Sequence, residues 1–328
     1  MKEFKSTTLI KKAFSSKETK KALPYVMFLG MFWQKYLGKY STVQALVSGS
    51  PTLSEEGMIK GFKRVSEISE SKIQFVYNVY SEEQINEDKT RKDAVIMHFP
   101  SNSEERKPFV LICAGREYSM VNSGAEAFST AKAFNDLGYT AFVVNYRVFE
   151  RPLMPLPIED LVMAVRFVNE HADEFNVLKD NYIVNGFSAG GNLVNLFCSK
   201  KVGYANYGLA KPLMNIAVYS GCDIVTEDEE DKKFKYTTKL LGYSRLELVN
   251  DYLVSKNAET FPKTFIVFAE DDDFVKPKEH QKLVDTLNEL KIENKVLIGY
   301  RGRHGFGSGE GTPLEGWVDK AIEYLLEK

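Results

Sequence analysis

Six short apolar runs, separated by segments with helical periodicity, limit the folds open to this chain more than any other feature. Each run is continuous rather than alternating, which is typical of strands buried on both faces of a parallel sheet. The runs cover residues 109–113, 141–146, 182–185, 215–219, 264–269 and 295–300. Their alternation with helical segments predicts a mostly parallel, doubly wound α/β sheet with helices on both faces.

Further strands and helix ends can be predicted around these runs. Apolar side chains alternate along residues 73–79 and residues 94–99 follow as a neighbour, so we expect an antiparallel start to the sheet. Ser123 and Glu126 have the spacing of a capping box, for a helix that ends at Gly138. Residues 312–315, which read Thr-Pro-Leu-Glu, predict a capped start for the last helix.

Charge and length divide the chain into two parts. Nine lysines and two glutamates fall within residues 1–40, whereas the rest of the 328 residues carries 34 basic and 43 acidic side chains. We expect residues 1–65 to form a basic, partly helical N-terminal extension and residues 66–328 to form one α/β domain. The polar segment 223–260 is interpreted as an insertion that could cap a site at the strand ends. The basic stretch has no arginine and no recognisable nucleic-acid-binding motif, so no nucleic acid partner is expected.

The apolar run 22–33 raises the question of a signal peptide or membrane anchor. It is shorter than the ~20 residues that span a bilayer. Pro24 interrupts it, and no small residues follow to prepare a cleavage site. Apolar side chains from Tyr25 to Tyr36 instead recur at helical spacing, which predicts a helix that packs over the α/β domain or forms a homodimer contact. We therefore expect a cytoplasmic protein without a membrane span, and secretion or surface association is the less favoured alternative.

The clearest chemical signal is Gly186-Phe187-Ser188-Ala189-Gly190, which follows a predicted strand and precedes a helical pattern. A G-x-S-x-G nucleophile elbow requires this strand–turn–helix context. In so sharp a turn, side chains at positions 186 and 190 would collide with neighbouring backbone, and the turn lifts the hydroxyl of Ser188 above the sheet. The N–H of Ala189, at the start of the helix, can then stabilise a developing oxyanion.

A serine hydroxyl needs a base at neutral pH, and the chain has four histidines. His98 and His171 precede Ser188, against the order of nucleophile, acid and base expected on this fold, and are interpreted as surface or packing residues. His280 falls in a charged helical segment and is expected to face solvent. His304 follows the last predicted strand, which leaves it as the candidate base.

The acid is expected after the strand at 264–269, where residues 270–275 read Glu-Asp-Asp-Asp-Phe-Val. Its role would be to orient the imidazole and to stabilise the imidazolium. Composition does not choose among the three aspartates, and Asp223, after an earlier strand, is a fallback. A second oxyanion donor is expected after the strand at 109–113, where Gly115 permits a tight turn and the N–H groups of Arg116 and Glu117 would face the site.

Taken together, segments 111–148, 186–192, 265–275 and 302–306 resemble the α/β-hydrolase superfamily, most closely its acetyl-xylan-esterase and carboxylesterase-like branch. The resemblance covers roughly residues 70–328 and makes this part the catalytic domain. It implies Ser188 as nucleophile, His304 as base and, by the D-x-x-V pattern, Asp272 as acid.

The resemblance also implies an oxyanion loop, with Gly115 and Tyr118 next to the substrate. The family's G-G-G-Y sequence is here Gly115-Arg116-Glu117-Tyr118. Two charged residues therefore stand where the family has glycines, at the position from which backbone N–H groups would donate to the oxyanion.

These features predict a serine hydrolase that cleaves carboxylic esters of short acyl groups or of carbohydrates through an acyl-enzyme. A peptidase or amidase of the prolyl-oligopeptidase type is one alternative, although the roughly 65 N-terminal residues cannot build the propeller of that group. A non-catalytic ligand-binding protein on the same fold is another, because Arg116 and Glu117 replace glycines in the oxyanion loop.

No cofactor or metal is expected from the sequence. The glycines between residues 302 and 311 do not have the spacing of a dinucleotide-binding fingerprint. Cys113, Cys198 and Cys222 form no close pair and are expected to be buried thiols. The expected partner is a small-molecule ester substrate.

Overall fold

The computed structural model of this chain describes residues 4–27, 38, 41–49 and 53–327. Most of the helix predicted between Tyr25 and Tyr36 lies outside these residues, and its described beginning is the 3-10 turn η2 (Leu23–Tyr25). No helix in the described part of the chain is both long and apolar enough to cross a bilayer.

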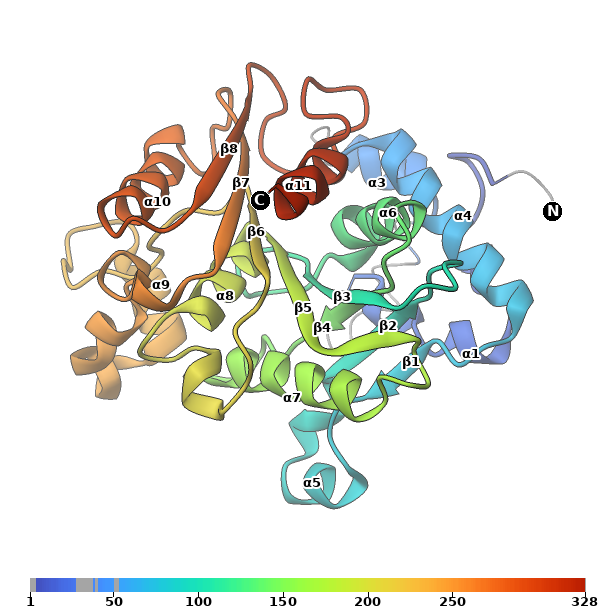
Figure 1. The fold of residues 1–328 in the computed structure, drawn as a ribbon, viewed down its shortest axis with the longest axis horizontal. Helices are drawn as coiled ribbons and strands as arrows, with labels where there is room; N and C mark the ends of the chain where they lie inside the picture. Colours follow the sequence, from blue (N-terminus) through green and yellow to red (C-terminus); the bar gives the residue numbers. More distant parts are fainter. Residues whose placement is uncertain (1–3, 28–37, 39–40, 50–52, 328) are drawn as a thin grey trace.

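The described residues form one eight-stranded sheet with the order β1-β2-β4-β3-β5-β6-β7-β8 (Figure 1). β1 (Val76–Asn78) pairs antiparallel with β2 (Val95–Phe99), and β2 pairs antiparallel with β4. All other pairs are parallel, which confirms the predicted sheet with its antiparallel start. The remaining strands are β3 (Lys107–Cys113), β4 (Ala141–Asn145), β5 (Val177–Phe187), β6 (Met214–Val218), β7 (Lys263–Ala269) and β8 (Asn294–Gly299).

One strand differs from the expectation that the continuous apolar runs are buried on both faces. β8 is the edge strand of the sheet, and the side chain of Ile298 in it is 47% exposed. A continuous apolar run therefore identifies a strand in this chain, but it does not separate an edge strand from a central one.

Helices cover both faces of the sheet (Figure 1). α6 (Ser123–Asp136) and α11 (Trp317–Leu326) pack against each other on one face, with α4 (Glu55–Ser71) outside α6. The opposite face carries α7 (Leu156–Glu170), α8 (Ala189–Cys198) and α10 (Pro277–Glu289). The shorter helices are α1 (Lys17–Lys20), α3 (Val43–Gly49), α5 (Glu82–Glu87) and α9 (Phe234–Leu241), and the 3-10 segments besides η2 are η1 (Ile10–Lys12), η3 (Lys89–Asp93), η4 (Tyr204–Tyr207), η5 (Tyr243–Tyr252), η6 (Val254–Lys256) and η7 (Ala258–Thr260).

Neither capping box predicted from the sequence is formed, although α6 begins at Ser123, within one residue of its predicted start. The N-cap position of α6 is Asn122, with no side-chain cap, and the carboxylate of Glu126 accepts a hydrogen bond from the N–H of Gly115 instead. α11 begins at Trp317, after a turn in which the hydroxyl of Thr312 accepts from the N–H of Leu314. The predicted end of α6 at Gly138 is confirmed, because Gly138 has a φ of 85° just after the helix.

The N-terminal residues pack onto α4. The ring of Phe62, which is fully buried, lies 5.8 Å from that of Phe4 and 6.3 Å from that of Phe14. On its other side it lies 5.9 Å from the ring of Phe128 in α6. α4 crosses residue 65, where the sequence predicted a boundary, so this helix links the two predicted parts.

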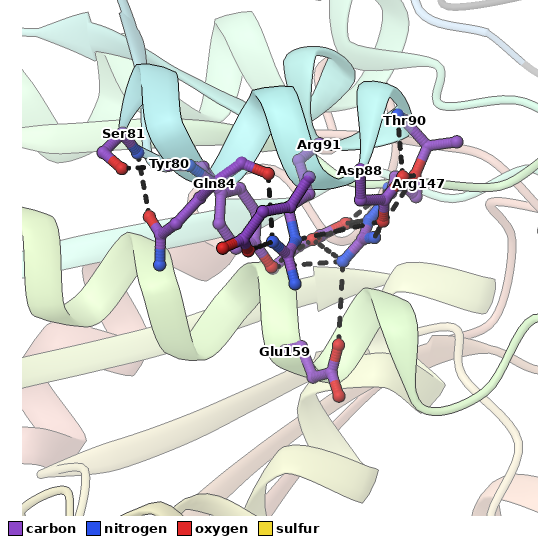
Figure 2. Close-up of polar contacts among 10 residues, drawn as sticks. Tyr80, Ser81, Gln84, Asp88, Thr90, Arg91, Arg147 and Glu159 are labelled. Carbon is purple, nitrogen blue, oxygen red and sulfur yellow. Dashed lines mark hydrogen bonds and ion pairs between the residues drawn. The ribbon is translucent and has the colours of Figure 1, made fainter.

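A buried charge cluster ties the connection between β1 and β2 to the end of β4 (Figure 2). The guanidinium of Arg147 donates to the carboxylate of Asp160, with its shortest bond at 2.6 Å, and to Asp88 at 3.0 Å. The hydroxyl of Tyr80 donates to Asp160 at 2.8 Å and accepts from Arg147 at 3.1 Å. No local sequence pattern marks this cluster, because its members are far apart in the sequence.

The three cysteines are free and buried, as the sequence predicted. Burial raises the pKa of each thiol. Among the described residues, no group of three or more His, Cys, Asp or Glu side chains is arranged to hold a metal ion.

Candidate active site

The predicted nucleophile lies in a sharp turn between β5 and α8. Ser188 has φ 51° and ψ −117°, a backbone conformation that residues other than glycine rarely adopt. A Cβ at Gly186 would lie 2.1 Å from the carbonyl oxygen of Gly190, and one at Gly190 would lie 2.1 Å from that of Cys113. Both distances are far shorter than non-bonded atoms can approach, so the predicted need for glycine at these two positions is confirmed.

Two side chains from other strand ends form a hydrogen-bonded path to this serine. His304, in the loop after β8, has Nε2 2.8 Å from the Oγ of Ser188. Its Nδ1 lies 2.9 Å from the Oδ2 of Asp272, in the loop after β7. The fold thus brings together the nucleophile, base and acid that the sequence named, although 116 positions separate Ser188 from His304.

The structure also distinguishes the aspartates that composition left open. Asp272 is buried and faces His304, whereas Asp271 accepts from the N–H groups of Gly302 and Arg303 at 2.8 and 2.6 Å. Asp271 therefore holds the loop that carries the histidine. Asp273 is exposed. The fallback residue Asp223 is bound by Ser255 and Lys282 and takes no part in the path.

The environment of Asp272 keeps it ionised. Burial opposes the charge, but contacts with the imidazoles of His280 and His304 and the N–H of Val275 lower its pKa to about 2. A carboxylate at this position can hold the proton of His304 on Nδ1 and leave Nε2 free to accept one.

The expectation that His280 faces solvent is wrong. Its side chain is fully buried, and its ring stacks on Phe268 with centroids 4.6 Å apart. Nδ1 lies 2.9 Å from the carbonyl oxygen of Ser220, and Nε2 lies 3.1 Å from that of Val275. The charged residues around it on α10 gave that part of the helix a polar pattern, although His280 lies on the buried face together with Leu283, Val284 and Leu287. The other two histidines pack against rings, with His98 beside Phe142 and His171 on Phe167.

The predicted oxyanion donors lie next to the nucleophile. Within the described residues, no acceptor is bound to the backbone N–H groups of Arg116, Glu117 or Ala189. Gly115 packs directly against the elbow, because a Cβ there would lie 2.5 Å from the carbonyl oxygen of Phe187. No group of the described residues therefore competes with a ligand for these N–H groups.

The oxyanion loop, residues 114–119, is bound by side chains for which the sequence predicted no role at the site. The hydroxyl of Tyr146 donates to the carbonyl of Ala114 at 2.6 Å, and Glu126 accepts from the N–H of Gly115 at 2.7 Å. Tyr118, predicted to lie next to the substrate, is buried and donates to the side chain of Asn192 at 3.0 Å.

Glu126 also links this loop to His304, the predicted base. It accepts from the hydroxyl of Tyr219 at 3.0 Å, and the ring of Tyr219 packs edge-on against His304 with centroids 4.9 Å apart. Burial raises the pKa of Glu126, and the hydrogen bonds from Gly115 and Tyr219 act against this increase. The capping-box pattern had marked Glu126 as a notable residue, but for a local role.

Two cavities open next to Ser188. One, of about 290 Å³, runs between the nucleophile and the connection from β6 to β7, and its walls include Tyr118, Ile224, Tyr236 and Phe274. The other, of about 230 Å³, lies on the side of His304. Its walls are Leu53, Arg116, Glu117, Asn122, Glu126, Ser188, Asp273, Phe274, His304 and Gly305.

A family model described as BD-FAE matches residues 96–287. The chain is 26% identical over 246 residues to endo-1,4-beta-xylanase B of Butyrivibrio fibrisolvens, covering 69% of this chain and 36% of that protein. It is 25% identical over 224 residues to an acetylxylan esterase of Xylanibacter ruminicola, covering 66% of this chain and 44% of that protein. The chain thus spans less than half the length of these curated relatives.

Solved structures show the same architecture. The acetyl ester-xyloside bifunctional hydrolase of Caldicellulosiruptor lactoaceticus superposes with a TM-score of 0.59 at 22% identity, over 70% of this chain and 86% of that one. At this identity the likeness establishes the fold, and it confirms the α/β-hydrolase architecture expected from the sequence.

Proposed function

Because the chain belongs to the BD-FAE family, we propose that it is a serine hydrolase that cleaves carboxylic esters. The observation that carries this proposal is the hydrogen-bonded path from Ser188 through His304 to Asp272. The name of one relative, an acetylxylan esterase, supports esters of carbohydrates as the substrate class, and the name of the other, a xylanase, supports a carbohydrate.

Acylation follows from the positions of these three side chains. The Oγ of Ser188 attacks the ester carbonyl carbon while Nε2 of His304 accepts the hydroxyl proton. Asp272 stabilises the imidazolium that forms. The N–H groups of Ala189 and Arg116 bind the oxyanion of the tetrahedral intermediate. The imidazolium then protonates the alcohol as it leaves, and the acyl group remains on Ser188.

Deacylation reverses these roles with water in place of the alcohol. His304 removes a proton from a water molecule, which attacks the acyl-serine. The carboxylic acid then leaves and Ser188 regains its proton from the imidazolium.

The two cavities give the two halves of an ester separate places. Both include Ser188 in their walls, so an ester bond at this residue can direct its acyl group into one cavity and its alcohol into the other. Volumes of about 290 and 230 Å³ are sufficient for short acyl groups and single sugar rings.

The test is turnover of p-nitrophenyl acetate and of acetylated xylo-oligosaccharides, together with labelling by a fluorophosphonate probe. Ser188→Ala should abolish labelling and lower kcat by about 10⁴-fold or more. Undiminished turnover in this variant would overturn the assignment. Faster hydrolysis of aminoacyl amides than of esters would favour the peptidase alternative, and tight ligand binding without labelling would favour a non-catalytic protein.

A further inference from the structure

The oxyanion loop has a backbone conformation that its sequence does not favour. Arg116, Glu117 and Tyr118 have φ values of 123°, 56° and 51°, so three successive residues with side chains lie in the region that glycine adopts most readily. A loop of this sequence needs contacts from outside to keep this backbone conformation.

The flanks of the loop are bound to the protein core, but its centre is not. Gly115 is held by Glu126 of α6 and by the N–H of Asn122, which donates to its carbonyl at 3.1 Å. Tyr118 is held by Asn192 of α8. Between them stands Glu117, whose contacts come from a different element.

Glu117 is bound by two side chains of α9. The ammonium of Lys239 donates to its backbone carbonyl at 2.6 Å, and the hydroxyl of Tyr236 donates to its carboxylate at 3.2 Å. In the described part of the chain, these are the hydrogen bonds that Glu117 makes. α9 belongs to residues 223–260, the segment that the sequence marked as an insertion.

The position of Lys239 is costly for a cation, which argues against an incidental surface contact. Burial lowers its pKa, the positive charges of Arg151 and Lys235 lower it further, and Glu117 acts in the opposite direction. α9 itself is anchored, because the carbonyl of Leu240 accepts from the N–H of Met154 at 2.9 Å and Thr226 bonds to Thr237 at 2.8 Å. The helix can therefore act as a fixed support for the loop.

We infer that Lys239 and Tyr236 are positioning residues for the oxyanion hole, which hold the Arg116–Glu117 backbone in the conformation that glycines would adopt in their place. The inference rests on the proposed function. Glu117 and Tyr236 both line the larger cavity, so a substrate group there can touch both the loop and its support. The support thus links recognition in that cavity to stabilisation of the oxyanion.

The first test is Lys239→Met, which keeps the length of the side chain and removes its donor. We expect kcat for p-nitrophenyl acetate to fall about tenfold, less than for outright loss of an oxyanion donor, with KM changed less than about twofold. Tyr236→Phe should give a smaller loss of kcat. Lys232→Met is the matched control, because Lys232 is exposed in the same segment and should keep wild-type kcat.

A second test separates positioning from a general weakening of the insertion. Glu117→Gly places at the centre of the loop a residue that adopts positive φ without support. In that background, Lys239→Met should lower kcat by less than about threefold relative to Glu117→Gly alone. An equal loss in both backgrounds, or no loss in the wild-type background, would overturn the inference.

Hydrogen exchange keeps the inference distinguishable from the proposed function. Lys239→Met should accelerate exchange of the peptide that covers residues 114–119, whether or not the protein hydrolyses esters. Unchanged exchange there would contradict the inference even if wild-type esterase activity is found. Absence of wild-type turnover and labelling, with accelerated exchange in the variant, would contradict the proposed function alone.

Discussion

Several residues with a strained backbone lie around Ser188. Ser188 and Tyr219 have φ values of 51° and 36°, and both lie beside His304. These two residues and the three residues of the oxyanion loop adopt backbone conformations with positive φ, which cost about 1–3 kcal/mol per residue. Such conformations persist where surrounding contacts stabilise them. For Tyr219, one such contact is the hydrogen bond from its hydroxyl to Glu126. The sequence identified the required glycines, but not these strained neighbours.

Asp272 makes stability depend on pH in a predictable direction. Its pKa is about 2 in the folded protein against an ordinary value of 3.8, so its carboxylate stabilises the fold above about pH 4. The contribution, about 2 kcal/mol, is lost as pH falls from about 4 to about 2. Asp272→Asn should therefore be less stable than wild type in urea unfolding at pH 7, and the two proteins should converge near pH 2.

The exposed neighbour Asp273 supplies the control for this measurement. Asp273→Asn should leave the free energy of unfolding within about 0.5 kcal/mol of wild type at both pH values. A difference between wild type and Asp272→Asn that stays constant from pH 7 to pH 2 would contradict the ionic explanation. The kcat of Asp272→Asn should also fall roughly 10⁴-fold, because the amide no longer holds the productive tautomer of His304.

Among the elements, the buried cluster of Arg147 fixes the connection between β1 and β2 to the rest of the sheet (Figure 2). Arg147 and Asp160 are both almost fully buried, so removing one partner leaves the other charge without compensation. We expect Arg147→Met to lower the free energy of unfolding by about 3–5 kcal/mol. Urea unfolding at neutral pH measures this loss.

A surface pair of the same chemistry provides the comparison. Arg106 and Asp173 form an exposed ion pair, and Arg106→Met should cost less than about 1 kcal/mol. The double variant Arg147→Met/Asp160→Leu should be more stable than Arg147→Met alone, because it leaves no unpaired buried charge. Equal losses in the free energy of unfolding for Arg147→Met and Arg106→Met would show that burial of the Arg147 cluster adds nothing to its contribution to stability.

Elements were predicted well where the signal is local, and poorly where a tertiary contact competes with it. The strands follow their apolar runs closely. Glu126 has the correct spacing for a capping box, yet it satisfies the N–H of Gly115 in another loop. His280 occupies a charged helix, yet it alone among its neighbours reaches the carbonyl of Ser220. Sequence spacing does not record which distant backbone group needs a partner.

At the scale of the whole molecule, the N-terminal residues form part of the hydrophobic core, where they pack against α4. Phe62 of α4 packs between Phe4 and Phe14 on one side and Phe128 on the other. Leu53, just before α4, reaches a wall of the cavity beside Ser188 and His304. The division into an extension and a catalytic domain is therefore open to a direct test of stability.

Phe62→Ala should lower the free energy of unfolding of the whole chain by about 3–5 kcal/mol, because it removes a fully buried ring. Unfolding should remain a single transition whether it is followed by helix content or by aromatic fluorescence. Tyr243→Ala, at a side chain that is 77% exposed, should change stability by less than about 0.5 kcal/mol. Two separate transitions, with the second one unaffected by Phe62→Ala, would instead support an extension that is independent of the catalytic domain.

The sequence by itself determined where most strands lie along the chain and the sharp turn at Ser188, and it predicted His304 as the base, because apolar runs, glycine spacing and chain order can be read directly from the sequence. It could not select Asp272 without a family resemblance, nor place Glu126, Tyr219 or His280. Those roles depend on which side chains face one another across strand ends, and three-dimensional packing decides that. The support of Glu117 by Lys239 is of the same kind, since 122 positions separate the two residues and only the fold brings them within hydrogen-bond distance.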